Sequence, residues 1–167
     1  AFVVQSLAIT AVFSVLNLLG GSRLHPLPFL LVLYLLSMRV RILVDVAGIL
    51  ASRGRLAAAE RLYRLALGLL PSPAERCLVA LNRGVCRLQA GDAASAAAML
   101  SGVLESDDYK AAGAKYQSAA HYNLGIALSR QGDKAAAAMQ MRRVIGLWPV
   151  SDCARRAEAA LRQLEQG

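Results

Sequence analysis

The feature that most constrains the fold of this chain is a short turn sequence that recurs three times. Gly-Arg at residues 54–55 and Gly-Asp at residues 91–92 and 132–133 each follow an apolar segment with helical periodicity. Each turn is followed by an alanine-rich segment, such as the four alanines at residues 135–138. Because glycine readily ends a helix, this recurrence predicts three helix pairs built on one plan.

A glycine inside a predicted helix indicates close packing. Gly125 lies within an apolar helical segment, where glycine costs about 1 kcal/mol relative to alanine. That cost is offset where the absent side chain lets a second backbone approach. Strand-like runs with a period of two are absent from the sequence, so the predicted fold class is all-α.

The pattern resembles the tetratricopeptide repeat (TPR), a helix-turn-helix unit of 34 residues. The family has a small residue midway along the first helix. Its second helix has an early alanine, then a bulky residue and a small or β-branched one, and a proline closes the unit. The matching residues are Ala47, Gly84 and Gly125; Ala59, Ala96 and Ala137; Tyr63, Leu100 and Met141; Ala66, Val103 and Val144; and Pro71 and Pro149.

The resemblance implies a helical solenoid of three repeats, at residues 40–71, 77–108 and 118–151. Gly125 and Ala137 then mark the point where the two helices of the third repeat cross. Residues 152–167 carry one apolar stripe and several arginines outside it, which is typical of a C-terminal capping helix.

Several positions depart from the family pattern. Gly54, Gly91 and Gly132 are 37 and 41 residues apart, so the connections carry extra residues, and residues 107–117 either extend a helix or form a mobile loop. Asp108 replaces the closing proline of the second repeat. Arg83 and Arg87 stand where the family buries apolar groups, so they either reach solvent at an edge or meet an acidic partner.

Residues 1–38 form an apolar head with a single charged side chain, Arg23. As a helix, residues 1–19 would be about 28 Å long, close to the thickness of a bilayer core, and are predicted to span a membrane. A secretory signal peptide is the competing interpretation, but the segment has no basic n-region and no A-x-A site.

Polar residues of the head fall on one stripe of a helix. This spacing favours packing against another membrane helix over a random scatter of tolerated polar residues, and Phe13, on another face, is expected to face lipid. The predicted packing residues are Ser6, Thr10, Ser14 and Asn17.

A second uncharged segment, residues 29–38, is too short for an ordinary span. It is predicted to be a short or re-entrant membrane segment that forms a helical hairpin with the first segment and continues into the first repeat. Alternatively, it shields the start of the stack. A basic cluster follows, which either favours the cytoplasmic or stromal side and anionic lipid or is a solvated face. Its members are Arg39, Arg41, Arg53 and Arg55.

Little in the sequence indicates catalysis. Three cysteines without CxxC spacing and two histidines predict reduced, buried thiols and neither a disulfide framework nor a zinc site. No phosphate loop, nucleophile elbow or HExxH motif occurs, and His121 occupies a packing position of the repeat. We therefore expect no catalytic residue, cofactor or small-molecule substrate. The net charge of +8 is scattered along the chain, so nucleic acid is not an expected partner.

By the resemblance, the first helices of the repeats line a groove for a peptide or helix. Leucines would form its apolar floor, and asparagines would hydrogen-bond an extended backbone. The predicted groove residues are Leu78, Leu81, Asn82, Val85, Leu88, Tyr122, Asn123, Ile126 and Arg130. The carboxylate clamp of TPR co-chaperones is not expected, because Val44, Gly48 and Ala119 occupy much of its place.

Three functions remain open from the sequence. The first is a membrane-anchored adaptor that binds, assembles or stabilises subunits of an integral membrane complex, an architecture similar to that of small TPR proteins that help assemble photosystem I. The second is a soluble adaptor that uses its apolar head for dimerisation or docking. The third is a regulatory subunit of an enzyme complex.

Overall fold

The computed structural model describes residues 7, 9–15 and 26–166, and the regular structure of this part is helical, as predicted. Residues 9–15 are helical, and eight further helices follow them in the described chain. These are α2 (Pro26–Ser52), α3 (Leu56–Gly68), α4 (Pro73–Gln89), α5 (Ala93–Glu105), α6 (Asp107–Ala111), α7 (Ala114–Arg130), α8 (Lys134–Leu147) and α9 (Asp152–Gln166).

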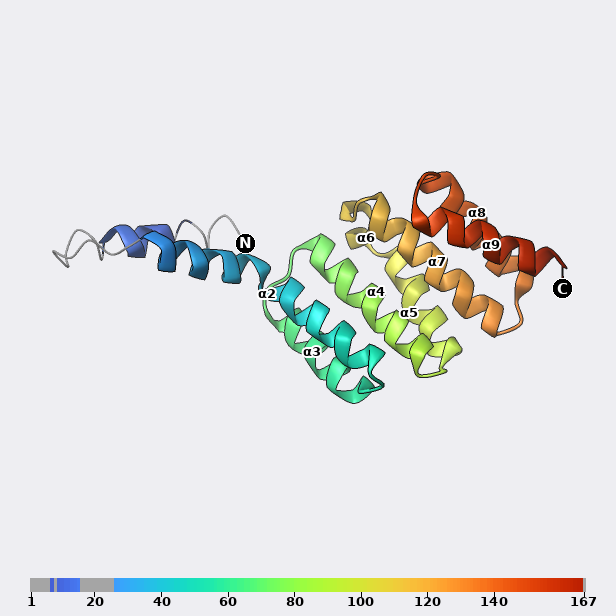
Figure 1. Cartoon of the computed structure of the whole chain (residues 1–167), viewed down its shortest axis with the longest axis horizontal. Coiled ribbons are helices and arrows are strands. Elements are labelled where there is room, and N and C mark those ends of the chain that lie inside the picture. Colours follow the sequence, from blue (N-terminus) through green and yellow to red (C-terminus); the bar gives the residue numbers. More distant parts are fainter. Residues whose placement is uncertain (1–6, 8, 16–25, 167) are drawn as a thin grey trace.

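Three antiparallel helix pairs form the body of the molecule: α2 with α3, α4 with α5, and α7 with α8 (Figure 1). Each pair is joined by a turn whose glycine has a positive φ, namely 75° at Gly54, 81° at Gly91 and 87° at Gly132. The same backbone bond closes each turn; for example, Asp92 N donates to Arg87 O at 3.0 Å. The predicted recurrence of the turn is therefore confirmed.

In the second and third pairs, a glycine on the first helix meets a large residue on the second. A Cβ atom on Gly84 would lie 2.7 Å from Leu100 Cγ, and one on Gly125 would lie 2.8 Å from Met141 Cε. The Gly125 position is also 3.3 Å from the carbonyl oxygen of Ala137, so the predicted approach of a second backbone is confirmed.

The helices are arranged in two layers. α2, α4, α7 and α9 pack side by side in an inner layer, while α3, α5 and α8 form an outer layer. Each outer helix contacts both its own partner and the next inner helix, which makes the stack continuous. α9 packs on α7 and α8 through the buried residues Ala154 and Ala157.

Two first helices begin one turn earlier than predicted, at Pro73 and Ala114 in place of residues 77 and 118. The start of α4 is fixed by a capping box, in which the Ser72 hydroxyl accepts from Glu75 N and the Glu75 carboxylate accepts from Ser72 N at 2.7 Å. The sequence Ser-Pro-Ala-Glu carries this signal, because the capping box is defined by a serine followed three residues later by glutamate.

The extra residues between the second and third pairs form the short helix α6 and the first turn of α7. Asp108 of α6 accepts two hydrogen bonds from the Arg76 guanidinium, at 2.8 and 2.6 Å, which attaches α6 to the start of α4. Hydrogen bonding to Arg76 lowers the pKa of Asp108. The residue that departs from the repeat pattern thus holds the insertion in place.

A second attachment of α6 runs through a buried histidine. His121 of α7 lies between Gln140 Oε1, 2.7 Å from Nδ1, and the Tyr109 hydroxyl, 3.0 Å from Nε2. Because the amide oxygen only accepts, Nδ1 carries the hydrogen and Nε2 accepts from the tyrosine. The neutral imidazole satisfies both contacts, and burial lowers the pKa of His121.

The two arginines at apolar repeat positions have different surroundings. Arg83 makes a bidentate ion pair with Glu60 of α3, with its shortest contact at 2.6 Å, and both side chains are half-buried. Arg87 is exposed at the end of α4. The acidic partner of Arg83 therefore belongs to this chain and joins the first pair to the second.

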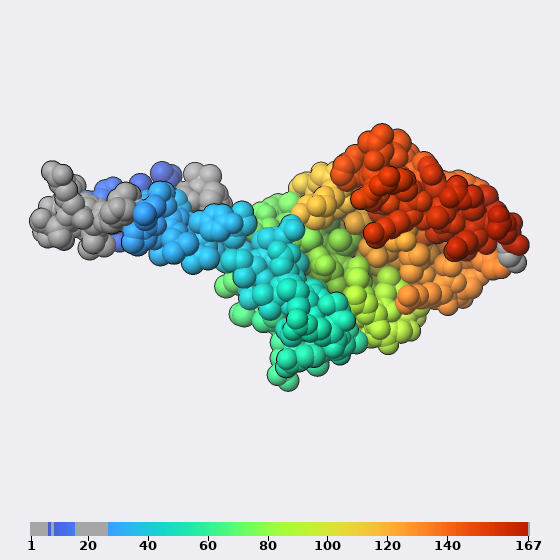
Figure 2. Space-filling view, in the orientation of Figure 1, coloured from blue at the N-terminus to red at the C-terminus, as the bar shows by residue number. Residues whose placement is uncertain are grey.

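α2 is one continuous helix with two different surroundings. Its second half packs on α3 through the buried residues Val40, Val44, Ala47 and Ala51. Its first half projects from the stack (Figure 2) and exposes large apolar side chains. These are Leu27, Leu30, Leu31, Val32, Tyr34, Leu35, Leu36 and Met38. The second apolar segment therefore runs on into the first helix pair, as predicted. Because its first half projects from the stack, it does not shield the start of the stack.

Residues Leu27–Ser52 form the described helix that is long and apolar enough to cross a membrane, with an 18-residue window of mean hydropathy 2.0. Only its projecting half, residues 27–38, is outside the stack, and that half is about 18 Å long. The ring of Phe13 stacks on Phe29 at 4.2 Å between centroids, so residues 9–15 lie beside the start of α2, as expected for a helical hairpin. This contact also differs from the expectation that Phe13 faces lipid.

We expect Gly84→Ala to lower the free energy of unfolding, because the new methyl group would lie 2.7 Å from Leu100 Cγ and 2.8 Å from Cδ2, so the whole buried side chain would have to move. Overpacking of this kind costs about 1 to 3 kcal/mol. Gly102→Ala in α5 is the matched control, since its Cβ would meet nothing within 4 Å. The control should gain up to about 1 kcal/mol from helix propensity. Denaturant unfolding of both variants measures the difference, and equal stabilities would contradict the assigned crossing.

Stability should also fall between about pH 7.5 and about pH 5.5, because the unfolded chain binds a proton at His121 that the folded chain excludes. In the folded chain the pKa of His121 is lowered. Its contribution to the free energy of unfolding is therefore complete above the pKa that the residue has in the unfolded chain, and it is lost as the pH falls towards the pKa in the folded chain. Denaturant unfolding at both pH values measures this loss. His121→Gln should be less stable at both pH values but less sensitive to pH; an unchanged pH dependence would argue against the neutral imidazole.

Candidate functional site

The inner layer of helices has a continuous surface with two hollows, which together we call the inner face. The first hollow, of about 410 Å³, lies over α2, α4 and the start of α7. The second hollow, of about 490 Å³, lies between α7 and α9. Lys115, in the first turn of α7, lines both and connects them. Together the two hollows can receive an extended segment of a partner protein.

The first hollow brings together residues from three helices. It is lined by Arg41, Val44, Asp45, Gly48, Ile49, Ser52, Leu78, Asn82, Lys115 and Tyr116. Arg41 donates to Asp45 Oδ2 at 3.1 Å and to the Tyr116 hydroxyl at 3.0 Å. The arginine therefore links α2 to α7 across α4, and its charge is matched within the hollow by Asp45.

The second hollow combines aromatic and charged side chains. It is lined by Lys115, Ala119, Tyr122, Trp148, Val150, Ser151, Asp152, Cys153 and Arg156. Trp148 follows the last residue of α8 and is 38% exposed, while Val150 in the connection to α9 is 89% exposed. Apolar surface is thus available beside two cations.

Two asparagines on the inner layer occupy equivalent positions in α4 and α7. Asn82 donates to Leu78 O and Asn123 donates to Ala119 O, each at 2.8 Å. An asparagine has two amide hydrogens and an acceptor oxygen. In the described part of the chain no further hydrogen bond of either side chain is found. Asn82 lines the first hollow and so keeps a donor and an acceptor for a ligand there, whereas Asn123 is half-buried and lines neither hollow.

The leucines predicted to form the groove floor lie mostly in the core. Leu81 and Leu88 are each 6% exposed and pack in the cluster between α4, α5 and α7. Leu78 is 8% exposed and reaches the first hollow only at its edge. The reason is that Leu81 and Leu88 pack against residues of α5 and α7. The apolar lining of the first hollow includes Val44 and Ile49 of α2 as well as Leu78.

The other predicted groove residues are divided between the hollows and the interfaces beside them. Tyr122 lines the second hollow. Val85 and Ile126 are half-buried, and Ile126 packs against two core clusters. Arg130 donates to Leu88 O at 2.7 Å and so joins the ends of α7 and α4. The structure therefore brings together Leu78 and Asn82 in one hollow and Tyr122 in the other.

Lys115, Tyr116, Trp148 and Arg156 were not predicted as groove residues. Lys115 and Tyr116 lie in the extra first turn of α7. Gly113, the N-cap residue of α7, is the sequence feature that could have indicated this earlier start of the helix. Trp148 and Arg156 come together only because α9 packs beside α7, which the sequence pattern alone does not specify.

The four arginines predicted as a juxtamembrane cluster are separated in the structure. Arg39 donates to the carbonyl oxygens of Leu69 at 2.9 Å and of Leu70 at 3.3 Å, so it caps the end of α3. Arg41 belongs to the first hollow. Arg53 and Arg55 lie at the opposite end of the pair, about 20 Å further along α2, because every residue adds about 1.5 Å to a helix. The four side chains therefore do not form a single cluster.

The predicted packing stripe of the head is only partly described. Ser6 and Asn17 lie outside the described residues. Thr10 and Ser14 are exposed, and the Ser14 hydroxyl donates to Thr10 O at 2.9 Å. Contact with α2 is made by Phe13, on a different face of the same helix.

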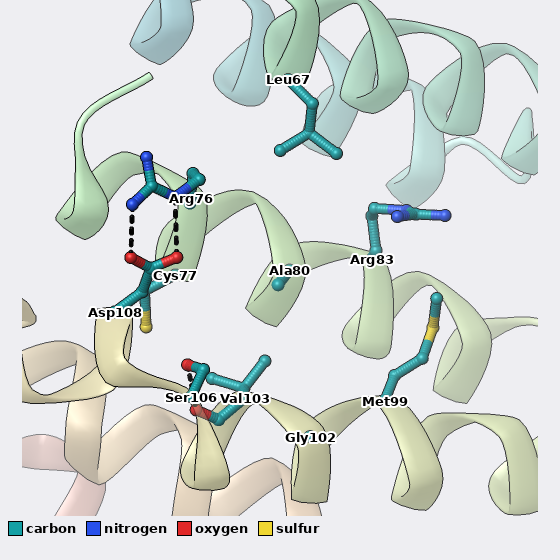
Figure 3. Close-up of a pocket in the computed structure, with 10 residues that line it drawn as sticks. All are labelled: Leu67, Arg76, Cys77, Ala80, Arg83, Met99, Gly102, Val103, Ser106 and Asp108. Atoms are coloured by element: carbon teal, nitrogen blue, oxygen red, sulfur yellow. Dashed lines mark hydrogen bonds and ion pairs between the residues drawn. The ribbon is translucent and has the colours of Figure 1, made fainter. Parts of the chain in front are cut away.

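An outer hollow of about 300 Å³ lies between α3, α5 and α6 above α4 (Figure 3). It is lined by Leu67, Arg76, Cys77, Ala80, Arg83, Met99, Gly102, Val103, Ser106 and Asp108. The Arg76–Asp108 pair closes one end, and Arg83, which is paired with Glu60, stands at the other. Its charges are thus neutralised within the chain, which makes it a weaker candidate than the inner face.

The cysteines and His121 lie in or beside the core of the described chain. The three cysteines are unpaired, Cys77 and Cys86 are buried, and burial raises the pKa of all three thiols. Among the described residues no three histidine, cysteine or acidic side chains are grouped as metal ligands. His121 uses both ring nitrogens inside the core. What the inner face offers is recognition by shape, amide groups and charge.

A comparison with protein-family models gives no match, and a search of curated protein sequences gives no significant match. The function of the inner face therefore has to be inferred from its own geometry and chemistry.

Replacing Tyr116 by phenylalanine should lower the free energy of unfolding by about 0.5 to 1 kcal/mol, because Arg41 Nη1 would lose its acceptor on α7. Tyr122→Phe is the matched control on the same helix, since no hydrogen bond of the Tyr122 hydroxyl occurs within the described residues. Its stability should be unchanged. Denaturant unfolding distinguishes the two variants, and equal losses would mean that the Arg41–Tyr116 link contributes nothing.

Proposed function

We propose that this chain is a TPR-type adaptor at a membrane, which holds a segment of an integral membrane complex in the groove of its inner face. In this proposal the apolar head inserts into the membrane and the helix pairs remain outside it. The protein would act by binding and positioning a partner, in the assembly or stabilisation of the complex.

The single observation that carries the proposal is the double role of α2. Its first half exposes a run of large apolar side chains, with Leu27 65%, Leu31 58% and Tyr34 58% exposed. Its second half supplies Arg41, Val44 and Asp45 to the first hollow. Contiguous apolar surface of this kind is rare on soluble monomers and usually marks contact with a membrane or another protein.

The geometry favours insertion as a hairpin over a straight crossing by α2. Its projecting half is shorter than the hydrocarbon core of about 30 Å, and its second half is buried against α3. Residues 9–15 lie beside the projecting half, so the two segments can share one apolar environment. Such a head would fix the inner face at a short distance from the membrane surface.

The TPR assignment is supported by features that recur at equivalent positions of the helix pairs. Each pair has the same glycine turn, and in two of them a glycine crosses a large residue of the second helix. The inner layer carries the amide groups of Asn82 and Asn123 at equivalent places. These features suit an extended or helical segment with apolar anchors.

The proposal predicts that partner binding and membrane attachment can be removed separately. Purification in mild detergent would compare the wild type with Asn82→Arg in the first hollow and with a double variant of the head, Leu31→Glu with Leu35→Glu. Asn82→Arg should lose the co-purified membrane subunit but stay in the pellet after alkaline carbonate. The head variant should leave the pellet, because carboxylates in a bilayer core cost several kcal/mol.

Leu65→Glu is the matched control, since Leu65 is an exposed leucine of α3 outside both surfaces. It should retain the partner and the pellet location. A head variant that stays in the carbonate pellet would contradict the anchor, and full recovery of the partner with Asn82→Arg would contradict the groove.

A further inference from the structure

The two hollows of the inner face differ in the number of lining cations that have no ion pair among the described residues: Lys115 alone in the first, and Lys115 with Arg156 in the second. In the first hollow the Arg41 guanidinium is paired with Asp45 at 3.1 Å. In the second hollow Lys115 and Arg156 are exposed, and neither makes an ion pair in the described part of the chain. The one acid of that hollow, Asp152, is already paired with Arg155. The second hollow therefore has two cations available for an anionic ligand.

Apolar surface lies in the same hollow as these cations. Trp148 and Val150 are exposed and Tyr122 is half-buried, so an apolar group of a ligand can contact all three. Trp148 is placed by its backbone, which leaves the helical region at φ −151° directly after α8. A ligand that carries an apolar group next to a carboxylate would satisfy both parts of the site.

We propose that the second hollow binds an acidic peptide segment, in which a carboxylate lies between Lys115 and Arg156 and a neighbouring apolar side chain contacts Trp148 and Tyr122. This inference rests on the proposed adaptor function and names the partner chemistry. It also fixes the direction of the bound segment. The acidic part lies over α7 and α9, and an uncharged part continues past Lys115 into the first hollow, where Arg41 is already paired with Asp45 and does not need a carboxylate from the ligand.

Trp148 makes the test specific to the site, because it is the only tryptophan of the chain. The probes are synthetic peptide pools without tryptophan, each with one leucine next to two fixed positions that hold glutamate, lysine, glutamine or phosphoserine. Each pool is titrated into the full-length protein in detergent, and the change in tryptophan emission is recorded at low and at high salt.

The glutamate pool should change the emission at the lowest concentration, and added salt should weaken its binding. Lys115→Glu with Arg156→Glu should reduce its affinity at least about tenfold, since the repelling charges lie directly at the carboxylate. Lys134→Glu with Arg162→Glu makes the same change in net charge at exposed positions outside the hollow. This control should bind as the wild type does.

The remaining outcomes separate this inference from the proposed function. If the lysine or glutamine pool binds best and Asn82→Arg removes that binding, the adaptor groove stands and the acidic ligand is wrong. Stronger binding of the phosphoserine pool than of the glutamate pool would identify phosphate as the ligand chemistry and overturn the carboxylate. Equal binding of glutamate peptides by the reversed variant would also overturn it. If no pool binds the wild type, both the acidic ligand and the peptide groove fail.

Discussion

The contact between a small residue on the first helix of a pair and a large residue on the second determines the rest of this structure. At Gly84 and Gly125 the missing side chains let Leu100 and Met141 reach the backbone of the partner helix. Helices that cross this closely can be joined by a turn of one glycine and its neighbours, as happens three times in the chain. Repetition of that unit places the first helices next to one another and so creates the inner face.

The same stacking explains how the head and the inner face are connected. Because α2 is one unbroken helix, its exposed half and the residues that it contributes to the first hollow belong to the same element. Arg39 strengthens this connection, since its guanidinium holds the carbonyl oxygens at the end of α3 at the point where α2 leaves the stack. An anchor built in this way would fix the orientation of the groove as well as its location.

The sequence predicts local and periodic features well and side-chain surroundings poorly. The glycine turns and the close approach at Gly125 follow from residue type and spacing alone, and both are confirmed. The resemblance to the repeat family predicts Leu81 and Leu88 as groove residues, but whether they reach the groove depends on how α4 packs against α5 and α7. Likewise, Arg39 and Arg41 are close in sequence to Arg53 and Arg55, but much of the second half of α2 lies between the two pairs.

Residues of the candidate site that were missed come from elements that meet only in the folded chain. The Gly113 N-cap and the extra turn of α7 bring Lys115 to the inner face, and the packing of α9 brings Arg156 opposite to it. The acidic partner of Arg83 was foreseen as one alternative, but only the fold identifies it as Glu60 of the preceding pair.

The most direct test of the central claim is site-specific photo-crosslinking in native membranes, with p-benzoylphenylalanine placed at one position at a time. Asn82 and Tyr122 represent the inner face, while Leu65 and Met99 represent the outer surface. The account predicts that the two inner positions crosslink to the same membrane subunit and that the outer positions do not. Crosslinks to that subunit from the outer positions alone would show that the inner face is not the binding site.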